Sequence, residues 1–245
     1  MQAYARTDIG QVRAVNQDVC FCSTSPVGPL PNLFIVADGM GGHQAGDYAS
    51  RYAIETFVDY VKAGAPGNLV RVVDAAVKTA NLKVYRKSKE EERLAGMGTT
   101  MVAAFVEGTQ LYAANVGDSR LYLIGSEINQ VTEDHSYVAA MVRAGEISAE
   151  EARFHPEKNV ITRAVGVAPS VKADFFEVDL APGDKILMCS DGLSNMLSDE
   201  RMFEIISQHD PHEAADLLIE EANANGGLDN ITALIIEPGV KEADQ

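Results

Sequence analysis

The strongest constraint on the fold is a set of short apolar runs separated by turn residues. Each run is five to eight residues long, which is typical of β-strands and too short for most helices. The runs cover residues 33–37, 99–106, 111–116, 120–124, 185–190 and 231–236. Several connections have only a few residues, which favours antiparallel pairing because a parallel crossover needs a dozen or more. We expect antiparallel sheets in which 99–106, 111–116 and 120–124 are three adjacent strands.

Three other segments repeat apolar residues with the period of a helix. In the first, apolar residues recur at every fourth position, at Ala45, Ala49, Ala53, Phe57 and Val61. Residues 69–84 and the segment that begins at Pro211 have similar stripes. Each stripe gives a helix one face to bury, so we predict a layered α+β fold with packed antiparallel sheets and helices outside. No linker or repeat interrupts the chain, so residues 1–240 are expected to form one domain and 241–245 a polar tail.

The charge balance limits the possible partners. The chain has 36 acidic and 20 basic residues and a formal net charge of -16, whereas nucleic-acid-binding proteins usually present a basic face. Three cysteines without scaffold-like spacing indicate a reduced compartment, and no apolar run approaches the length of a membrane span. We therefore predict a cytoplasmic protein with no membrane segment in this chain and no nucleic-acid partner.

Four carboxylates stand where strands are expected to begin or end. They belong to the turns Asp38-Gly39, Gly117-Asp118, Asp191-Gly192 and Asp229-Asn230. Any one of them could be an ordinary turn residue, but four next to strong apolar runs can converge at one end of a sandwich. Converging carboxylates repel one another unless cations neutralise them, and oxygen ligands without Cys or His favour Mg²⁺ or Mn²⁺. A pair of such ions can clamp a phosphoryl group, so a strongly acidic protein could still receive a phosphate.

A glycine-rich run at 39–46 follows one of these strands and opens a helix. Its spacing fits neither G-x-G-x-x-G nor a P-loop, and no lysine follows it. We therefore favour glycines that let the backbone approach a metal closely over a nucleotide-binding loop.

Six segments together resemble the ordered motifs of the PP2C (PPM) family of protein phosphatases. They read RAVNQD at 13–18, DGMGGH at 38–43, GMGTT at 96–100, GDSR at 117–120, SDGL at 190–193 and GLDNIT at 227–232. The resemblance extends over residues 7–232 and is strongest to bacterial Ser/Thr phosphatases, which oppose eukaryotic-like kinases. It implies a four-layer α-β-β-α sandwich, with phosphorylated proteins, a Ser/Thr kinase and its substrates as partners.

The resemblance also implies a reaction and a set of metal ligands. A hydroxide that bridges two Mn²⁺ or Mg²⁺ ions would hydrolyse phosphoserine and phosphothreonine. Asp38 would bridge the two ions, the carbonyl of Gly39 would bind one of them, and Asp191 and Asp229 would bind the other. Asp18 would act through a metal-bound water.

Two further roles follow from the same resemblance. Asp118, together with Asp191, would hold a weaker third ion, and Arg13 would bind the substrate phosphate. The general acid is open: animal members carry a His directly after the Asp-Gly pair, where this chain has Met40. His43 is one candidate, and a histidine that only starts a helix is the alternative.

Residues 132–166 resemble the flap of bacterial members, which borders the active site; a surface helical excursion is the alternative. Two other functions are compatible with the residues. One is a catalytically silent phosphoprotein-binding module, and the other is a two-metal hydrolase of phosphodiesters or small phosphate metabolites.

Overall fold

The computed structural model describes residues 1–42, 45–64 and 67–240, and it contains two antiparallel sheets. Sheet A has the strand order β1 (Gln2–Asp8), β11 (Ile231–Glu237), β10 (Lys185–Cys189), β7 (Arg120–Ile124), β8 (Ile128–Gln130). Sheet B has the order β2 (Asp18–Ser23), β3 (Leu33–Met40), β5 (Met101–Glu107), β6 (Gln110–Val116), β9 (Asp174–Asp179), and β4 (Gly98–Thr99) also pairs with β3.

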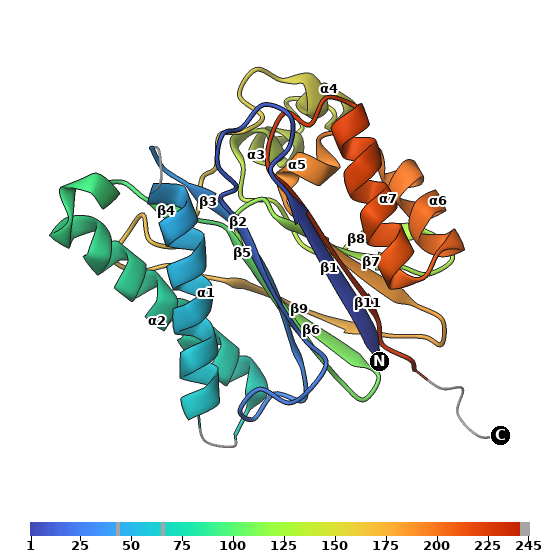
Figure 1. The fold of residues 1–245 in the computed structure, drawn as a ribbon, viewed down its shortest axis with the longest axis horizontal. Helices are drawn as coiled ribbons and strands as arrows, with labels where there is room; N and C mark the ends of the chain where they lie inside the picture. The colour runs from blue at the N-terminus through green and yellow to red at the C-terminus, as the bar shows by residue number, and fades with distance from the viewer. Residues whose placement is uncertain (43–44, 65–66, 241–245) are drawn as a thin grey trace.

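Helices cover the outer face of each sheet. Figure 1 shows α1 (Ala45–Ala63) and α2 (Leu69–Glu90) on one side of the molecule, with α6 (Asp199–Gln208) and α7 (Pro211–Ala224) on the other. A short 3-10 helix, Glu92–Leu94, follows α2. One apolar core lies between α1, α2 and sheet B, another between sheet A and the C-terminal helices, and a third between the two sheets. The predicted four-layer sandwich of antiparallel sheets and flanking helices is confirmed.

The helices form where the sequence stripes predict them. All five stripe residues of α1 are buried against sheet B. Helix α2 begins after Asn68, whose side chain accepts a hydrogen bond from the backbone N–H of Arg71, and α7 has Asp210 as its N-cap and Pro211 in its first turn. Such caps satisfy backbone donors that a helix start leaves without partners. None of the helices in the described ranges has the length and apolarity needed to cross a bilayer.

The structure corrects two expectations about strands. The strand β7 does not lie beside β6; it belongs to sheet A, between β10 and β8. The connection 117–119 is a corner between sheets, and Gly117 takes a φ of 109° there. The strand β3 does not stop before Asp38 but runs on to Met40, because β2 pairs with it as far as Asp38 and β4 pairs with Gly39.

Residues 132–166, here called the flap segment, carry two short helices. They are α3 (Tyr137–Ala144), capped by Ser136, and α4 (Ala149–Phe154), which starts with a capping box of Ser148 and Glu151. Both lie at the end of the sandwich where α5 (Asp191–Ser194) begins (Figure 1). The predicted tail 241–245 lies outside the described residues.

Candidate metal centre

The five predicted carboxylates come from both sheets. Asp18 begins β2 and is paired across the ladder with Asp38 of β3. Asp118 lies in the corner between β6 and β7, Asp191 begins α5 with one residue between it and the end of β10, and Asp229 lies just before β11. Because strands of both sheets end here, residues far apart in the chain meet at one end of the sandwich.

These carboxyls lie close enough for their negative charges to raise one another's pKa values. Burial raises the pKa of Asp38 well above its usual value, and the negative charges of Asp18 and Asp191 raise it further. Burial and the charge of Asp229 raise the pKa of Asp191, and a hydrogen bond with Asp38 partly offsets this. A hydrogen bond between two carboxyl groups requires a proton on one of them. Without cations, the cluster therefore retains protons to limit its own repulsion.

Asp18 is the most firmly held member of the cluster. It is only 4% exposed, and its Oδ2 accepts hydrogen bonds from Ser190 Oγ at 2.6 Å and Thr232 Oγ1 at 2.8 Å. Burial raises the pKa of Asp18 to about 7 despite these two hydroxyl donors, and the charges of Asp191 and Asp229 contribute to the rise. Both hydroxyls lie in the family motifs at 190–193 and 227–232, yet sequence reasoning gave them no role.

Three carboxylate oxygens of the cluster are buried without a hydrogen-bond partner. They are the Oδ1 atoms of Asp18, Asp118 and Asp191. A buried acceptor without a partner costs about 1–3 kcal/mol, more when it is charged, so a site that holds three of them calls for a bound species. Hard oxygen donors of this kind fit Mg²⁺ or Mn²⁺.

The carboxylates alone do not form a complete cage. Within residues 1–42, 45–64 and 67–240, no three Asp, Glu, His or Cys side chains already converge as a ligand set. Mg²⁺ usually keeps several waters and takes only one or two carboxylates, so this donor set fits such an ion with water and backbone oxygens completing its shell.

Gly39 is required by close packing. A Cβ at this position would lie 2.0 Å from the carbonyl oxygen of Gly46 and 2.8 Å from that of Gln17. Only glycine lets β3 approach the start of α1 this closely, so the structure explains this glycine by backbone packing. The expected close approach of the glycine-rich run to a metal stays a prediction. The proposed metal-binding role of the Gly39 carbonyl stays a prediction.

Arg13 lies at the edge of the cluster. Its guanidinium Nη2 donates to Asp229 Oδ2 at 2.7 Å, and about half of its side chain is exposed. This hydrogen bond is the main cause of the raised pKa of Arg13, and the charges of Asp38 and Asp191 also contribute. A cation thus already stands beside the carboxylates, within reach of solvent.

The motif at 96–100 fixes the backbone of Asp38. Thr100 Oγ1 accepts from the N–H of Asp38 at 2.8 Å, and the N–H of Thr100 donates to the Asp38 carbonyl at 2.8 Å. Thr99 Oγ1 donates to the same carbonyl at 2.8 Å. The sequence shows this motif, but only the structure shows that it positions Asp38.

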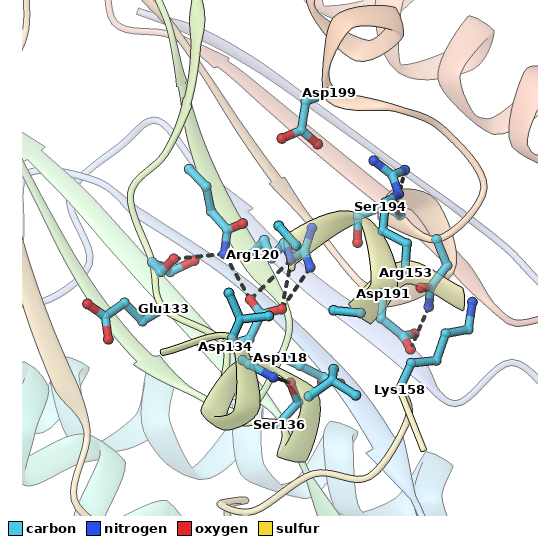
Figure 2. A pocket seen from close by; sticks show the side chains of 18 of the residues that line it. Asp118, Arg120, Glu133, Asp134, Ser136, Arg153, Lys158, Asp191, Ser194 and Asp199 are labelled. Carbon is cyan, nitrogen blue, oxygen red and sulfur yellow. Dashed lines mark hydrogen bonds and ion pairs between the residues drawn. The ribbon is translucent and has the colours of Figure 1, made fainter. Parts of the chain in front are cut away.

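A cavity of about 500 Å³ adjoins the cluster. Figure 2 shows Asp118 and Asp191 on its wall, with Arg153 and Lys158 from the flap segment, and Arg143 also lines it. The flap segment therefore borders the site, as the resemblance predicts. His43, the candidate general acid, lies outside the described residues.

Comparison with known proteins is consistent with this geometry. The model of the family described as Protein phosphatase 2C matches residues 10–217. The chain is 42% identical to the serine/threonine phosphatase stp of Listeria monocytogenes serotype 4b (strain F2365), over 97% of this chain and 96% of that protein. It is 37% identical to the protein phosphatase PhpP of Streptococcus pneumoniae over the full length of both.

Solved structures show the same fold. The catalytic domain of the serine/threonine protein phosphatase PstP, in complex with two manganese ions, superposes with a TM-score of 0.84 at 36% identity, over 96% of each chain. The sandwich fold is therefore shared with this phosphatase. The chain belongs to the protein phosphatase 2C family and is a protein phosphatase, a hydrolase of phosphoric monoesters.

Proposed function

We propose that this phosphatase hydrolyses phosphoserine and phosphothreonine in proteins, using two Mn²⁺ or Mg²⁺ ions and a weaker third. The observation that carries the proposal is the set of three buried, partnerless carboxylate oxygens at the end of the sandwich. When bound, the two ions would supply a hydroxide nucleophile at neutral pH and neutralise charge on the phosphoryl group.

The residues of this chain would bind the metal ions and orient the substrate phosphate. Asp38, Asp191 and Asp229 would hold the two ions, with the Gly39 carbonyl and a water held by Asp18. Asp118 and Asp191 would hold the third. Arg13 would bind the phosphoryl oxygens with the part of its guanidinium that faces away from Asp229, a task for which its planar fork of donors is suited.

The buried thiol next to the site supports hydrolysis without a covalent intermediate on the protein. Cys189 directly precedes Ser190 but is fully buried, and burial raises the pKa of its thiol to about 12. A thiol in that state is not a nucleophile at neutral pH. Direct attack on phosphorus is the pathway that the remaining groups support.

Phosphorylated proteins are the proposed partners, among them a Ser/Thr kinase and its substrates, and the proposed compartment is the cytoplasm. The relatives from Listeria and Streptococcus are named as serine/threonine or protein phosphatases, which supports the substrate class. The kinase follows from the family resemblance.

The test is Mn²⁺-dependent release of phosphate from a phosphothreonine peptide. Chelation should abolish the release and Mn²⁺ should restore it, and Asp38→Ala should lower kcat/KM by about a thousand-fold or more, the scale of several kcal/mol of charge stabilisation. Asp74→Ala is a matched control, because Asp74 lies on α2 and its carboxylate pairs only with Lys78 among the contacts described.

The two other candidate functions give different results in the same assay. A silent phosphoprotein-binding module would bind the peptide without releasing phosphate. A hydrolase of diesters or small metabolites would turn over bis-(p-nitrophenyl) phosphate faster than the peptide. Either outcome would contradict the proposal.

A further inference from the structure

The two loops that carry Arg13 and Asp229 also expose large apolar side chains. Val12 is 64% exposed and Leu228 57% exposed. Ile9 and Val15, on the same loop as Val12, are partly exposed as well. Single exposed apolar residues are normal, but these four lie on two loops in mutual contact. We call Ile9, Val12, Val15 and Leu228 the apolar shelf.

Hydrogen bonds hold the shelf in place. The side-chain amide of Asn230 donates to the carbonyls of Ile9 at 2.9 Å and Val15 at 3.0 Å, so it ties both ends of the first loop. The N–H of Gln11 donates to the Gly227 carbonyl of the second loop at 2.7 Å. The backbones of the two loops are therefore held together.

Close packing of Gly10 adds to this fixation. Its φ is 79°, and a Cβ there would lie 2.2 Å from the carbonyl oxygen of Asp229, so only glycine allows the two loops to touch. In Figure 1 both loops, after β1 and before β11, lie at the end of the sandwich where α5 begins. Both loops therefore lie beside the candidate metal centre, since one carries Arg13 and the other Asp229.

A phosphoresidue bound at Arg13 would lie next to this surface. Val12 directly precedes Arg13, Leu228 directly precedes Asp229, and the Arg13 guanidinium lies 2.7 Å from the Asp229 carboxylate. A phosphoresidue bound here brings its chain neighbours along at about 3.3 Å per residue, so they contact whatever surrounds the site. On another side of the cluster, the cavity presents the cationic side chains Arg143, Arg153 and Lys158 instead.

We propose that the apolar shelf binds an aliphatic or aromatic side chain of an extended phosphopeptide, within a few residues of the phosphoresidue. Val12 and Leu228 are then specificity-determining residues. This inference rests on the proposed phosphatase function. Binding energy from side chains outside the reacting group lowers the barrier when it helps to hold that group in place.

The test uses a series of phosphothreonine peptides whose flanking residues are all serine except one. That one residue is leucine, and its position differs from peptide to peptide. The wild type should show a kcat/KM about ten-fold higher for at least one leucine position, the order expected for burying part of a leucine side chain. The double variant Val12→Ser, Leu228→Ser should lose this preference. Its ratio of peptide to p-nitrophenyl phosphate turnover should fall by about the same factor.

Leu82→Ser is the matched control, because Leu82 is an exposed leucine on α2, away from both loops. Equal kcat/KM across the peptide series, or an equal loss of preference in Leu82→Ser, would overturn the proposal. So would a change of oligomeric state in the double variant by sedimentation, because the shelf would then serve self-association. If no peptide releases phosphate with Mn²⁺, the proposed phosphatase function is wrong. If the peptides are hydrolysed without any preference for a leucine position, only the proposed role of the apolar shelf is wrong.

Discussion

Asp18 illustrates how a single buried carboxylate can be held for a ligand. One oxygen is fixed by the hydroxyls of Ser190 and Thr232, while the other has no partner. Thr232 lies in β11 of sheet A and Ser190 directly follows β10 of the same sheet, whereas Asp18 belongs to sheet B. The residue thus ties the sheets together and leaves one oxygen for water or a cation.

The raised pKa of Asp18 predicts a pH-dependent stability for the metal-free protein. Its pKa is about 7 in the folded state, against 3.8 for an ordinary aspartate. Between these values the folded state binds more protons than the unfolded state, so the free energy of unfolding falls as pH rises toward 7. Burial raises the pKa values of Asp38 and Asp191 too, which adds in the same direction. Urea unfolding at pH 5.5 and 7.5 in chelator measures the fall.

Asp18→Asn provides the comparison, because its amide does not ionise. We expect its stability to fall less between the two pH values than that of the wild type. Identical falls would show that Asp18 does not titrate in this range.

The side chain of Arg13 is expected to contribute to substrate binding. Replacing it by Ala should raise KM for a phosphothreonine peptide about ten-fold or more, since a hydrogen bond to a charged group contributes about 1.5–3 kcal/mol. The affinity for Mn²⁺, measured by calorimetry, should not weaken, because the change frees Asp229 from its ion pair. Arg13→Lys keeps the positive charge but lacks the planar set of guanidinium donors, so it should recover part of the lost substrate binding. Unchanged KM in Arg13→Ala would remove Arg13 from the phosphate site.

At the scale of elements, two hydrogen bonds with His135 hold the corner between β6 and β7. The N–H of Gly117 donates to His135 Nδ1 at 3.0 Å, and the N–H of His135 donates to the Gly117 carbonyl at 3.0 Å. Since Nδ1 accepts, the ring proton lies on Nε2, which donates to Asp174 at 2.9 Å. Burial lowers the pKa of His135, which favours this neutral form. These hydrogen bonds hold the corner in which Asp118 lies.

His135→Ala should therefore destabilise the protein by about 1–3 kcal/mol, the cost of leaving the buried Gly117 N–H without an acceptor. It should also raise the Mn²⁺ concentration needed for full activity, since Asp118 loses its support. His135→Asn keeps an acceptor near Nδ1 and should recover part of both effects. Urea unfolding and Mn²⁺ titration measure them, and an alanine variant with wild-type stability would contradict the assignment.

Elements also show what the sequence could predict. The stripe of α1 and the apolar runs of β3, β10 and β11 depend on local periodicity, so their positions were confirmed. The placement of β7 was wrong because a short connection serves equally for a hairpin and for a corner between sheets. The carboxylates could be found from their turns and the family motifs. The hydroxyls of Ser190 and Thr232 could not, since their contact with Asp18 exists only after both sheets pack.

At the scale of the whole molecule, a net charge of -16 and a buried acidic cluster predict strong stabilisation by divalent cations. A ligand at one hundred times its dissociation constant adds about 2.7 kcal/mol to the folded state, which for a domain of this size raises Tm by about 5–10 °C. Calorimetry with and without Mn²⁺ measures this shift. Asp191→Ala should lose most of it, whereas Asp74→Ala should keep it. An equal shift in both would indicate nonspecific screening of surface charge.

The pairing of β1 with β11 has a consequence for synthesis on the ribosome. The strand β11 lies between β1 and β10 in sheet A, and all seven residues of β1 pair with it. It is also the last described strand to be translated, and it carries Thr232, one of the two hydroxyls on Asp18. The strand β1 can therefore gain its neighbour in sheet A only after all the residues between the two strands have been synthesised. The metal centre should stay incomplete, and the enzyme inactive, until β11 has been translated and has left the exit tunnel.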